Sequence, residues 1–223
     1  MKEIRVGVIG IGSMGRHHVR NVRETSGETL VAVADPAGDK FGVAGELEVL
    51  PDVSALIEAG IEAAVVAVPT AFHLEVALQL AAAGVPALIE KPLARTVEEG
   101  EQIVTAFQRA NLVGAAGYVE RCNPALIELQ KRVAAGELGE VFQIATRRQG
   151  PFPARISDVG VIKDLATHDV DLTAWIAGSR YQSVSARTAR KSGREHEDLL
   201  FATGVLENGV LVLSLIHISE PTR

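Results

Sequence analysis

The feature that most constrains this chain is the regular alternation of short apolar runs with helical segments between Ile4 and about Gly117. The apolar runs are nearly continuous in hydrophobicity, which is typical of parallel strands covered by helices on both faces. We expect strands at Ile4–Ile9, Thr29–Ala34, Ala63–Val68, Ala87–Ile89 and Leu112–Ala116, and helices at His17–Thr25, Ser54–Ala59, Phe72–Ala83 and Val97–Ala110. This alternation predicts an α/β fold with a doubly wound parallel sheet in residues 1–117.

The pattern changes after Gly117, where a helix comes first and strands follow. We expect helices at Pro124–Ala135 and Val161–Ile176, and strands at Val141–Arg148, Tyr181–Ala189, Glu197–Leu206 and Val210–Leu215. The last two strands are joined through Glu207-Asn208-Gly209, and Asn-Gly is a strong hairpin signal. This order predicts a second, incomplete α+β domain over residues 118–213, with an open and mainly antiparallel sheet.

Composition and charge exclude several classes of protein. Hydrophobic residues make up 47% of the 223 residues, charged residues 22%, and the net charge is −6. These values are typical of globular chains, and no cluster of Lys and Arg offers the basic surface that nucleic acids require. The single cysteine, Cys122, excludes an internal disulfide, and we expect it to be buried. We also expect a cytoplasmic protein without signal peptide or membrane span, because polar residues, Gly84 and Pro86 interrupt the longest apolar stretch, Leu74–Ile89.

A glycine-rich turn follows the first predicted strand. The sequence Gly10-Ile11-Gly12-Ser13-Met14-Gly15 matches G-x-G-x-x-G between a strand and a helix. Gly10 permits a tight turn, Gly12 lets the backbone approach a pyrophosphate, and Gly15 lets helix and strand pack closely. Asp35 ends the second strand, where a carboxylate binds ribose hydroxyls and repels a 2′-phosphate. We therefore expect a Rossmann domain that binds NAD in preference to NADP through Gly10, Gly12, Ser13, Met14, Gly15 and Asp35. The alternative is a glycine turn with a capping aspartate.

A second motif, Ile89-Glu90-Lys91-Pro92, lies at the carboxyl end of a predicted strand. Ligands of open α/β sheets bind at this end of the strands, so Lys91 is expected to face the cofactor cleft. An amine in that position can carry a proton or polarise a substrate oxygen. The alternative is a solvated strand end, in which Lys91 has no chemical role.

The third motif is D-x-x-x-H-D-x-D over Asp164–Asp171, on a predicted helix. Asp164 and His168 are four residues apart and therefore share a helix face. Imidazoles ordinarily exchange protons near neutral pH, so His168 can accept a hydroxyl proton while a neighbouring carboxylate orients it. One alternative is a pair on the helix surface. Another is a metal site completed by Asp171, but we expect no metal because no further His or Cys cluster accompanies the motif.

Together the three motifs resemble those of the Gfo/Idh/MocA-type oxidoreductases, the family of glucose-fructose oxidoreductase and inositol dehydrogenase. The resemblance runs from Met1 to about Leu213. It implies a catalytic set of Lys91, Asp164 and His168, and it extends the cofactor-binding set to Pro69, Thr70, His73, Glu90 and Lys91. The implied reaction is oxidation of a sugar hydroxyl. His168 or Lys91 takes the proton, Asp164 orients the pair, and the carbon passes hydride to the nicotinamide.

Two segments, Gly117–Pro124 and Gly150–Gly160, carry a narrower resemblance to the branch that includes UDP-N-acetylglucosamine 3-dehydrogenases. Arginine forks suit a diphosphate or carboxylate, and aromatic rings suit a sugar or uracil. The expected substrate-binding residues are Tyr118, Arg121, Asn123, Phe152 and Arg155, with Arg147 and Arg148 as further forks. The alternatives are interdomain salt bridges for the arginines, a dehydrogenase of a free sugar or inositol, and a dinucleotide-binding protein without turnover.

The end of the chain departs from the family pattern. Family members continue further, which is why the second domain is expected to be incomplete here. Residues 214–223, SLIHISEPTR, resemble translated adaptor or read-through sequence, and we interpret them as a non-native tail. At full length we expect a homo-oligomer that acts on a sugar or nucleotide sugar, without nucleic-acid or membrane partners.

Overall fold

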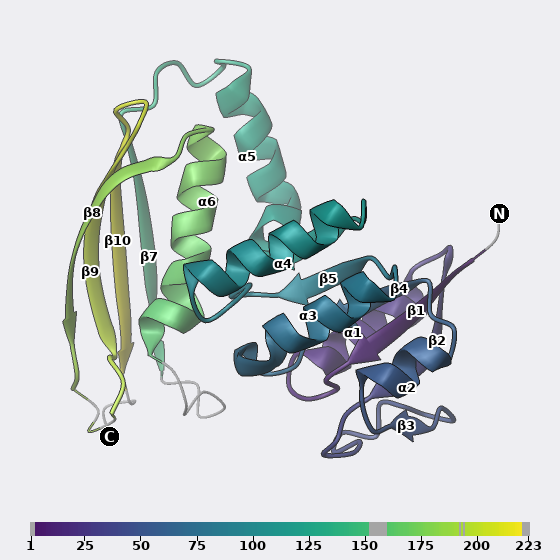
Figure 1. Ribbon diagram of the computed structural model, residues 1–223. Coiled ribbons are helices and arrows are strands. Elements are labelled where there is room, and N and C mark those ends of the chain that lie inside the picture. Colours follow the sequence, from purple (N-terminus) through teal and green to yellow (C-terminus); the bar gives the residue numbers. More distant parts are fainter. Residues whose placement is uncertain (1–2, 152–159, 192, 194, 220–223) are drawn as a thin grey trace. The chain divides into compact units, whose positions relative to one another are not determined.

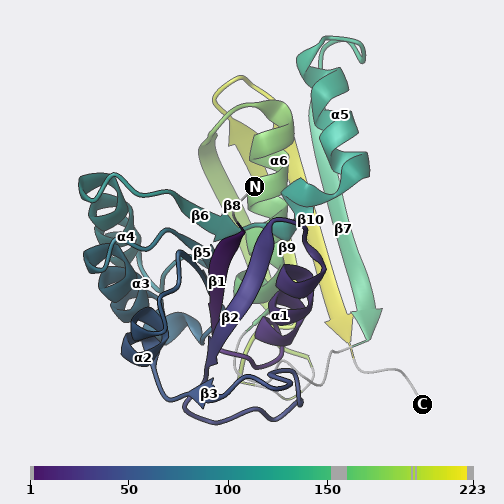
Figure 2. The same ribbon diagram turned by 90° about the vertical axis from the view of Figure 1, so that its right-hand side faces the viewer.

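The computed structural model describes residues 3–151, 160–191, 193 and 195–219 (Figure 1). Contacts within the chain divide it into two compact units, Met1–Gly117 and Tyr118–Arg223. The first unit is built on a parallel sheet and the second on a mixed sheet (Figures 1 and 2). Within the described residues, no helix combines the length and the apolar character needed to cross a membrane.

The first unit contains a six-stranded parallel sheet in the order β3-β2-β1-β4-β5-β6. Its strands are β1 (Ile4–Ile9), β2 (Glu28–Ala34), β3 (Val49–Leu50), β4 (Ala63–Val66), β5 (Ala87–Glu90) and β6 (Gly114–Gly117). The chain runs from β1 outward to β3 and then returns to β4 on the other side of β1. This reversal makes a topological switch point between β1 and β4 and confirms the predicted doubly wound fold.

Two layers of helices cover this sheet (Figure 2). They are α1 (Gly15–Glu24) on one face and α2 (Val53–Glu58), α3 (His73–Ala82) and α4 (Val97–Arg109) on the other. Val8 and Val33 are fully buried in the α1 layer, and Leu56 is fully buried in the opposite layer. A Cβ at Gly7 would lie 2.8 Å from Ile61 Cγ2 and 3.0 Å from Leu56 Cδ2. Glycine in β1 therefore lets these two side chains pack directly on the strand.

The predicted strands and helices of this unit end within two residues of the observed ones. The additional strand, β3, is formed by Val49 and Leu50, which pair with Val33 and Ala34 of β2. Two residues are too few for a periodic pattern, because strand prediction depends on alternation over a longer run. The sequence therefore carries no signal for this edge of the sheet.

The second unit contains an open four-stranded sheet in the order β7-β10-β9-β8. Its strands are β7 (Gln143–Pro151), β8 (Tyr181–Ala189), β9 (Leu199–Leu206) and β10 (Leu211–Ser219). β9 is antiparallel to both β8 and β10, whereas β10 is parallel to β7. The predicted hairpin at Asn208-Gly209 joins β9 to β10, and Gly209 has the positive φ, 87°, that such turns need.

Helices α5 (Pro124–Ala134) and α6 (Thr167–Ala177) lie on the same side of this sheet (Figure 1). A π-helical turn, Ile162–Ala166, leads directly into α6 where one continuous α-helix is predicted. Val161 and Ala166 pack against Leu200 of β9 and Ile216 of β10, so the turn belongs to the core of the unit. The helix stops at Gly178, whose φ of 60° is the left-handed conformation that ends helices.

The last strand continues past residue 213. β10 pairs with β7 as far as Ser219, and Ile216 and Ile218 are 2% and 8% exposed. These two isoleucines extend the alternation of the strand and pack beside Val161 and Leu200. Residues 214–219, which the sequence analysis interprets as part of a non-native tail, form the end of a strand in the structure, and their non-native origin stays a prediction. Residues 220–223 lie outside the described residues.

The Leu56→Ala variant should lower the free energy of unfolding by about 2–5 kcal/mol, because it leaves a cavity between α2 and β1. Chemical denaturation followed by circular dichroism measures the change. The matched control is Val104→Ala on α4, where Val104 is 45% exposed and the change should stay within about 0.5 kcal/mol. Equal losses in the two variants would contradict this account of the core.

Candidate active site

The turn between β1 and α1 passes directly against the chain that leaves β4. Gly10 has φ of 81°, and a Cβ there would lie 2.6 Å from the amide nitrogen of Val68. A Cβ at Gly15 would lie 1.7 Å from the carbonyl oxygen of Gly10. Neither distance is possible for a real Cβ, so only glycine permits this packing. At Gly12, in contrast, a Cβ would meet no atom of the described residues within 4 Å.

The space at Gly12 adjoins the N-terminus of α1. Met14 is the N-cap residue, its side chain forms no capping hydrogen bond, and both Ser13 and Met14 are exposed. The first turn of a helix leaves backbone N–H groups without partners inside the helix, and the helix dipole favours an anion there. An uncapped helix start beside open space fits a pyrophosphate, the group that a dinucleotide places on such a turn.

Asp35 ties the end of β2 to the same turn. Its Oδ2 accepts a hydrogen bond from the N–H of Ile11 at 3.0 Å, and its Oδ1 accepts one from the N–H of Ala37 at 2.8 Å. Asp35 therefore caps backbone N–H groups of two turns, as the alternative interpretation of the sequence expects. Because a carboxylate has about four acceptor positions, Asp35 retains capacity for ribose hydroxyls, which fits NAD as well.

Several of the predicted cofactor residues follow neighbouring strands on one edge of the sheet. Pro69 and Thr70 come after β4, where Thr70 begins a short 3₁₀ helix (η1, Thr70–Phe72). Glu90 ends β5 and Lys91 follows it. Since β1, β4 and β5 are parallel neighbours, the glycine turn and these residues lie on the carboxyl edge, where open α/β sheets bind ligands.

Glu90 is held from both sides by groups of the first unit. Its Oε1 lies 2.7 Å from Nε2 of His18 on α1, and its Oε2 accepts the N–H of Lys91 at 3.1 Å. Burial on its own raises the pKa of Glu90, but the hydrogen bonds from His18 and Lys91 and their positive charges hold that pKa below its ordinary value. His18 is absent from the predicted site. Its only sequence signal is its place one turn beyond Gly15.

His73 is expected from the resemblance to lie near the cofactor, and its ring is buried, with 1% of the residue exposed. Nε2 lies 3.0 Å from the carbonyl oxygen of Val68, and Nδ1 lies 3.0 Å from that of Pro92. The imidazole therefore joins the end of β4 to the chain after Lys91. Because both contacts are to backbone carbonyl groups, the ring holds these two backbone segments together at the edge of the sheet.

Asp164 and His168 lie on one continuous helical segment of the second unit. Asp164 is in the π turn, His168 is in the first turn of α6, and both are half-buried. π turns are rare and occur frequently at functional sites. Within the described part of the chain, no three His, Cys, Asp or Glu side chains are arranged to hold a metal ion.

Asp169, next to His168, is a buried carboxylate that sequence analysis misses. It is 1% exposed and accepts hydrogen bonds from Thr146 Oγ1 at 2.8 Å, Ser214 Oγ at 2.8 Å and Arg148 Nε at 2.6 Å. Burial lowers the pKa of Arg148, but its pairing with Asp169 and Glu120 outweighs that effect and raises the pKa. Arg148, considered as a fork for substrate, is instead the partner that fixes α6 on the sheet.

The segment after Gly117 holds three predicted substrate residues. Arg121 donates from Nε and Nη2 to the two carboxylate oxygens of Asp171, at 2.8 and 2.5 Å, so its fork is occupied within the second unit. Asn123 caps α5 by accepting the N–H of Ala125 at 3.0 Å. Cys122 lies in a short 3₁₀ helix (η2, Val119–Cys122) and is exposed, which corrects the expectation that it is buried.

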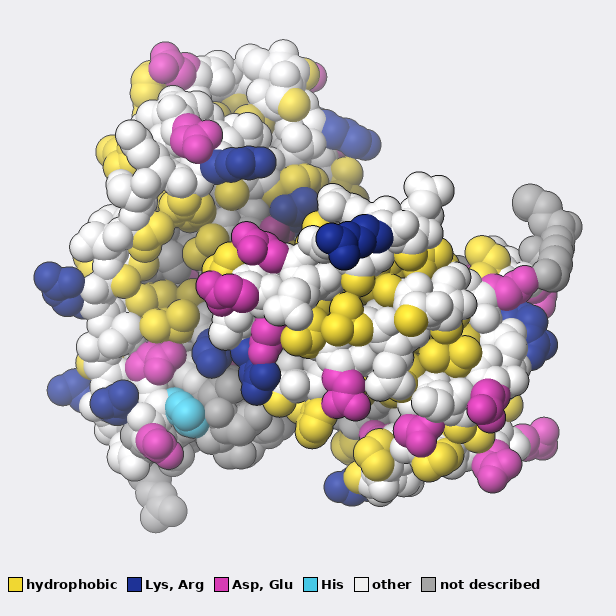
Figure 3. Space-filling model, in the orientation of Figure 1, with side chains coloured by type: hydrophobic (Ala, Val, Ile, Leu, Met, Phe, Trp, Pro, Cys, Tyr) yellow, Lys and Arg dark blue, Asp and Glu magenta, His cyan; other side chains and the backbone are white. Residues whose placement is uncertain are grey.

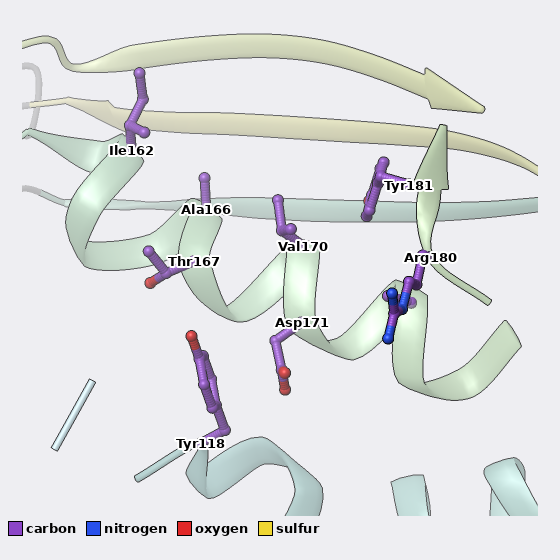
Figure 4. A pocket seen from close by; sticks show the side chains of 9 residues that line it. Tyr118, Ile162, Ala166, Thr167, Val170, Asp171, Arg180 and Tyr181 are labelled. Atoms are coloured by element: carbon purple, nitrogen blue, oxygen red, sulfur yellow. The ribbon is translucent and has the colours of Figure 1, made fainter. Parts of the chain in front are cut away.

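The third of these residues, Tyr118, lines a pocket of about 440 Å³ in the second unit. The other lining residues are Ile162, Ala166, Thr167, Val170, Asp171, Ala174, Arg180 and Tyr181. Figure 4 shows the Tyr118 hydroxyl directed towards Thr167, with the Asp171 carboxylate beside it. In Figure 3, apolar side chains gather in a hollow of this unit and charged side chains surround it.

Burial and the Asp171 carboxylate raise the pKa of Tyr118, and Arg121 opposes them only in part. Its hydroxyl is therefore neutral near pH 7 and can both donate and accept a hydrogen bond. A pocket with apolar lining on one side of the helix and hydroxyl and carboxylate groups on the other can hold a ring that carries several hydroxyl groups. The remaining predicted substrate residues, Phe152 and Arg155, lie outside the described residues.

Comparison with known proteins agrees with this description. Residues 4–118 match an oxidoreductase family described as having an NAD-binding Rossmann fold, and residues 126–220 match the GFO/IDH/MocA C-terminal domain. The match of the second domain includes most of the residues that were interpreted as a tail.

Two curated relatives are each 34% identical to this chain. Inositol 2-dehydrogenase 2 of Saccharopolyspora erythraea aligns with 94% of the chain and 65% of its own length. UDP-N-acetylglucosamine 3-dehydrogenase of Acidithiobacillus ferrooxidans aligns with 100% of the chain and 70% of its own length. The chain therefore spans about two thirds of the length of these relatives.

A solved structure of the Acidithiobacillus ferrooxidans enzyme superposes with a TM-score of 0.85 at 30% sequence identity, covering 100% of this chain and 69% of that one. The two domain matches, the identity and the shared fold lead to one conclusion. This chain belongs to the Gfo/Idh/MocA family of oxidoreductases, and its first unit is the NAD-binding Rossmann domain of that family.

Proposed function

We propose that this chain oxidises a hydroxyl group of a sugar or cyclitol and transfers the hydride to NAD. The observation that carries the proposal is the carboxyl edge of the parallel sheet, where the open space at Gly12 follows β1 and Lys91 follows β5. Such an oxidation requires a turn that binds the dinucleotide and a group that can carry a proton, and the first unit has a glycine turn and an amine on the same edge of its sheet. The dehydrogenase names of relatives at 34% identity support the same reaction class.

In this proposal NAD lies in the crevice of the first unit. The backbone N–H groups between Gly12 and Gly15 hold the pyrophosphate, and Asp35 accepts the ribose hydroxyls. The negative charge of Asp35 disfavours the 2′-phosphate of NADP. Pro69, Thr70 and Lys91 complete the set of residues around the cofactor. When bound, the nicotinamide ring accepts the hydride.

A carbon that loses hydride from a C–OH group becomes a carbonyl only if the hydroxyl proton also leaves, so the reaction needs a base. We assign that role to His168 or Lys91, and we assign to Asp164 the orientation of the base. His168 and Asp164 are half-buried on one helical segment. Asp169, the neighbour of His168 in the sequence, accepts a hydrogen bond from Arg148 of β7 and so ties that segment to the sheet.

The pocket beside Tyr118 is the proposed site for the ring of the substrate. Ile162, Ala166 and Val170 lie along one side of the helix in Figure 4, and this apolar lining suits the apolar face of a ring. Tyr118 and Asp171 offer partners for ring hydroxyls at its side. Arg121 holds both oxygens of Asp171, which orients the carboxylate and leaves its remaining acceptor positions for the substrate.

For the substrate itself we propose a nucleotide sugar of the UDP-N-acetylglucosamine type. The relative that bears that name matches the whole chain in sequence and in structure. Arg180 lines the pocket and is exposed, so its guanidinium can meet a phosphate. A free cyclitol is the second candidate, because a relative named inositol 2-dehydrogenase 2 is equally identical. The internal pairing of Arg121 and Arg148 favours this second candidate, since it removes two forks from a diphosphate.

The glycine turn gives a test of the cofactor site. Gly12→Ala should weaken NAD binding by about tenfold or more while leaving the melting temperature unchanged, because its methyl group enters only the space assigned to the pyrophosphate. Gly15→Ala should lower the melting temperature, because its methyl group meets the carbonyl of Gly10. Calorimetric titration with NAD and thermal unfolding separate the two effects. Unchanged NAD affinity in Gly12→Ala would remove the pyrophosphate from this turn.

The reaction is tested by absorbance at 340 nm with NAD and a panel of UDP-N-acetylglucosamine, free sugars and inositols. Lys91→Ala should lower kcat/KM by about 10²–10⁴-fold with the accepted substrate, because it removes a candidate proton carrier. Lys131→Ala, an exposed lysine on α5, is the matched control and should leave the rate unchanged. Reduction of NAD with inositols alone would select the cyclitol. Bound NAD without reduction by any member of the panel would argue for a dinucleotide-binding protein without turnover.

A further inference from the structure

Three elements of the first unit meet at the carboxylate of Glu90. His18 reaches it from α1, Lys91 contacts it through its backbone at the end of β5, and Gly117 faces it from the end of β6. Glu90 is 8% exposed, so the carboxylate has left most of its water behind. A buried carboxylate is tolerated only when it is paired with hydrogen-bond donors or positive charges. Displacing one partner of Glu90 therefore also disturbs the contacts of the others.

The contact with His18 has a defined polarity. An ionised carboxylate only accepts hydrogen bonds, and the pKa of Glu90 lies below its ordinary value, so the carboxylate is charged near neutral pH. Nε2 of His18 must therefore carry the proton and donate it at 2.7 Å. The other carboxylate oxygen accepts the N–H of Lys91 at 3.1 Å. The two hydrogen bonds share one rigid group and cannot shift independently.

Space for this group is left by Gly117. A Cβ at that residue would lie 3.0 Å from Cδ, 3.1 Å from Oε2 and 3.1 Å from the backbone Cα of Glu90. Oε2 is the oxygen that accepts the N–H of Lys91. A methyl group at this position therefore presses on both the carboxylate and the backbone of Glu90 without removing any polar partner.

We propose that His18 and Glu90 act as a positioning pair that fixes the backbone of Lys91 and ties it to α1. α1 begins at the turn assigned to the pyrophosphate, so the pair sets the distance between the cofactor turn and the lysine amine. Neither side chain needs to touch a reacting atom, because both act through the N–H of Lys91. The expected effect of this pair on the reaction rate rests on the proposed function. Its expected effect on the backbone of Lys91 does not.

The backbone consequence is measured by amide hydrogen exchange of the protein without cofactor, followed by NMR. His18→Ala should speed exchange at Lys91 about tenfold or more, because the carboxylate loses the partner that holds it. Exchange at Val66 in the central strand β4 should stay unchanged, which distinguishes local release from unfolding. His18→Gln keeps an N–H donor at the same place in the side chain and should restore slow exchange. Arg20→Ala, an exposed change on α1, is the matched control.

Gly117→Ala is a second variant that retains both partners, and it should also speed exchange at Lys91 because its methyl group displaces Glu90, including Oε2. Slow exchange at Lys91 in both His18→Ala and Gly117→Ala would overturn the positioning pair. So would equal acceleration in His18→Ala and His18→Gln, because the donor would then be irrelevant.

The catalytic consequence is measured with the substrate that the wild type accepts. His18→Ala should lower kcat about tenfold while KM for the sugar stays within about twofold, and His18→Gln should recover most of kcat. A rise in KM alone would place His18 in substrate binding and overturn the positioning role. If the wild type reduces no NAD, the proposed function fails, and the exchange measurement still decides whether the pair holds Lys91.

Discussion

The first unit depends on how closely two pieces of backbone approach at the switch point of its sheet. Gly15 lies where a Cβ would stand 1.7 Å from the carbonyl oxygen of Gly10, and a Cβ at Gly10 would stand 2.6 Å from the amide nitrogen of Val68. This approach places the start of α1 beside the ends of β1 and β4, so the positive end of the helix dipole lies at the carboxyl edge of the sheet. The same contacts leave Gly12 facing open space. Folding therefore depends on two glycines of the motif, and the proposed pyrophosphate site uses a third.

A single buried carboxylate connects separate elements in each unit. Glu90 links α1, β5 and β6 in the first unit, and Asp169 links α6 to β7 and β10 in the second. Each lies next to a proposed catalytic residue, Lys91 or His168. Because an unpaired buried charge is costly, the partners of these acids are held in fixed positions. The hydrogen bonds and ion pairs of these two acids therefore hold the backbone next to each proposed catalytic side chain.

The sequence is sufficient to predict the fold class, most element bounds and the residues that follow strands on one sheet edge, because these depend on periodicity and glycine spacing. It does not predict the partners of those residues. The contact between His18 and Glu90 joins residues far apart in the chain, and no local pattern encodes it. Likewise, Arg121 and Arg148 are of a residue type that often binds phosphate or carboxylate groups of a substrate, but in the structure they pair with Asp171 and Asp169. The predicted last strand ends at Leu215, whereas β10 runs to Ser219, because Ile216 and Ile218 continue its alternation.

The π turn over Ile162–Ala166 makes the pairing of Asp164 and His168 tolerant of the loss of one residue. A π turn holds more residues than an α-helical turn, so loss of one residue there would convert it to ordinary helix. Asp164 and His168 would then stand three residues apart, and side chains at that spacing still share a helix face. The acid and the imidazole can therefore remain neighbours although the spacing between them in the sequence has changed.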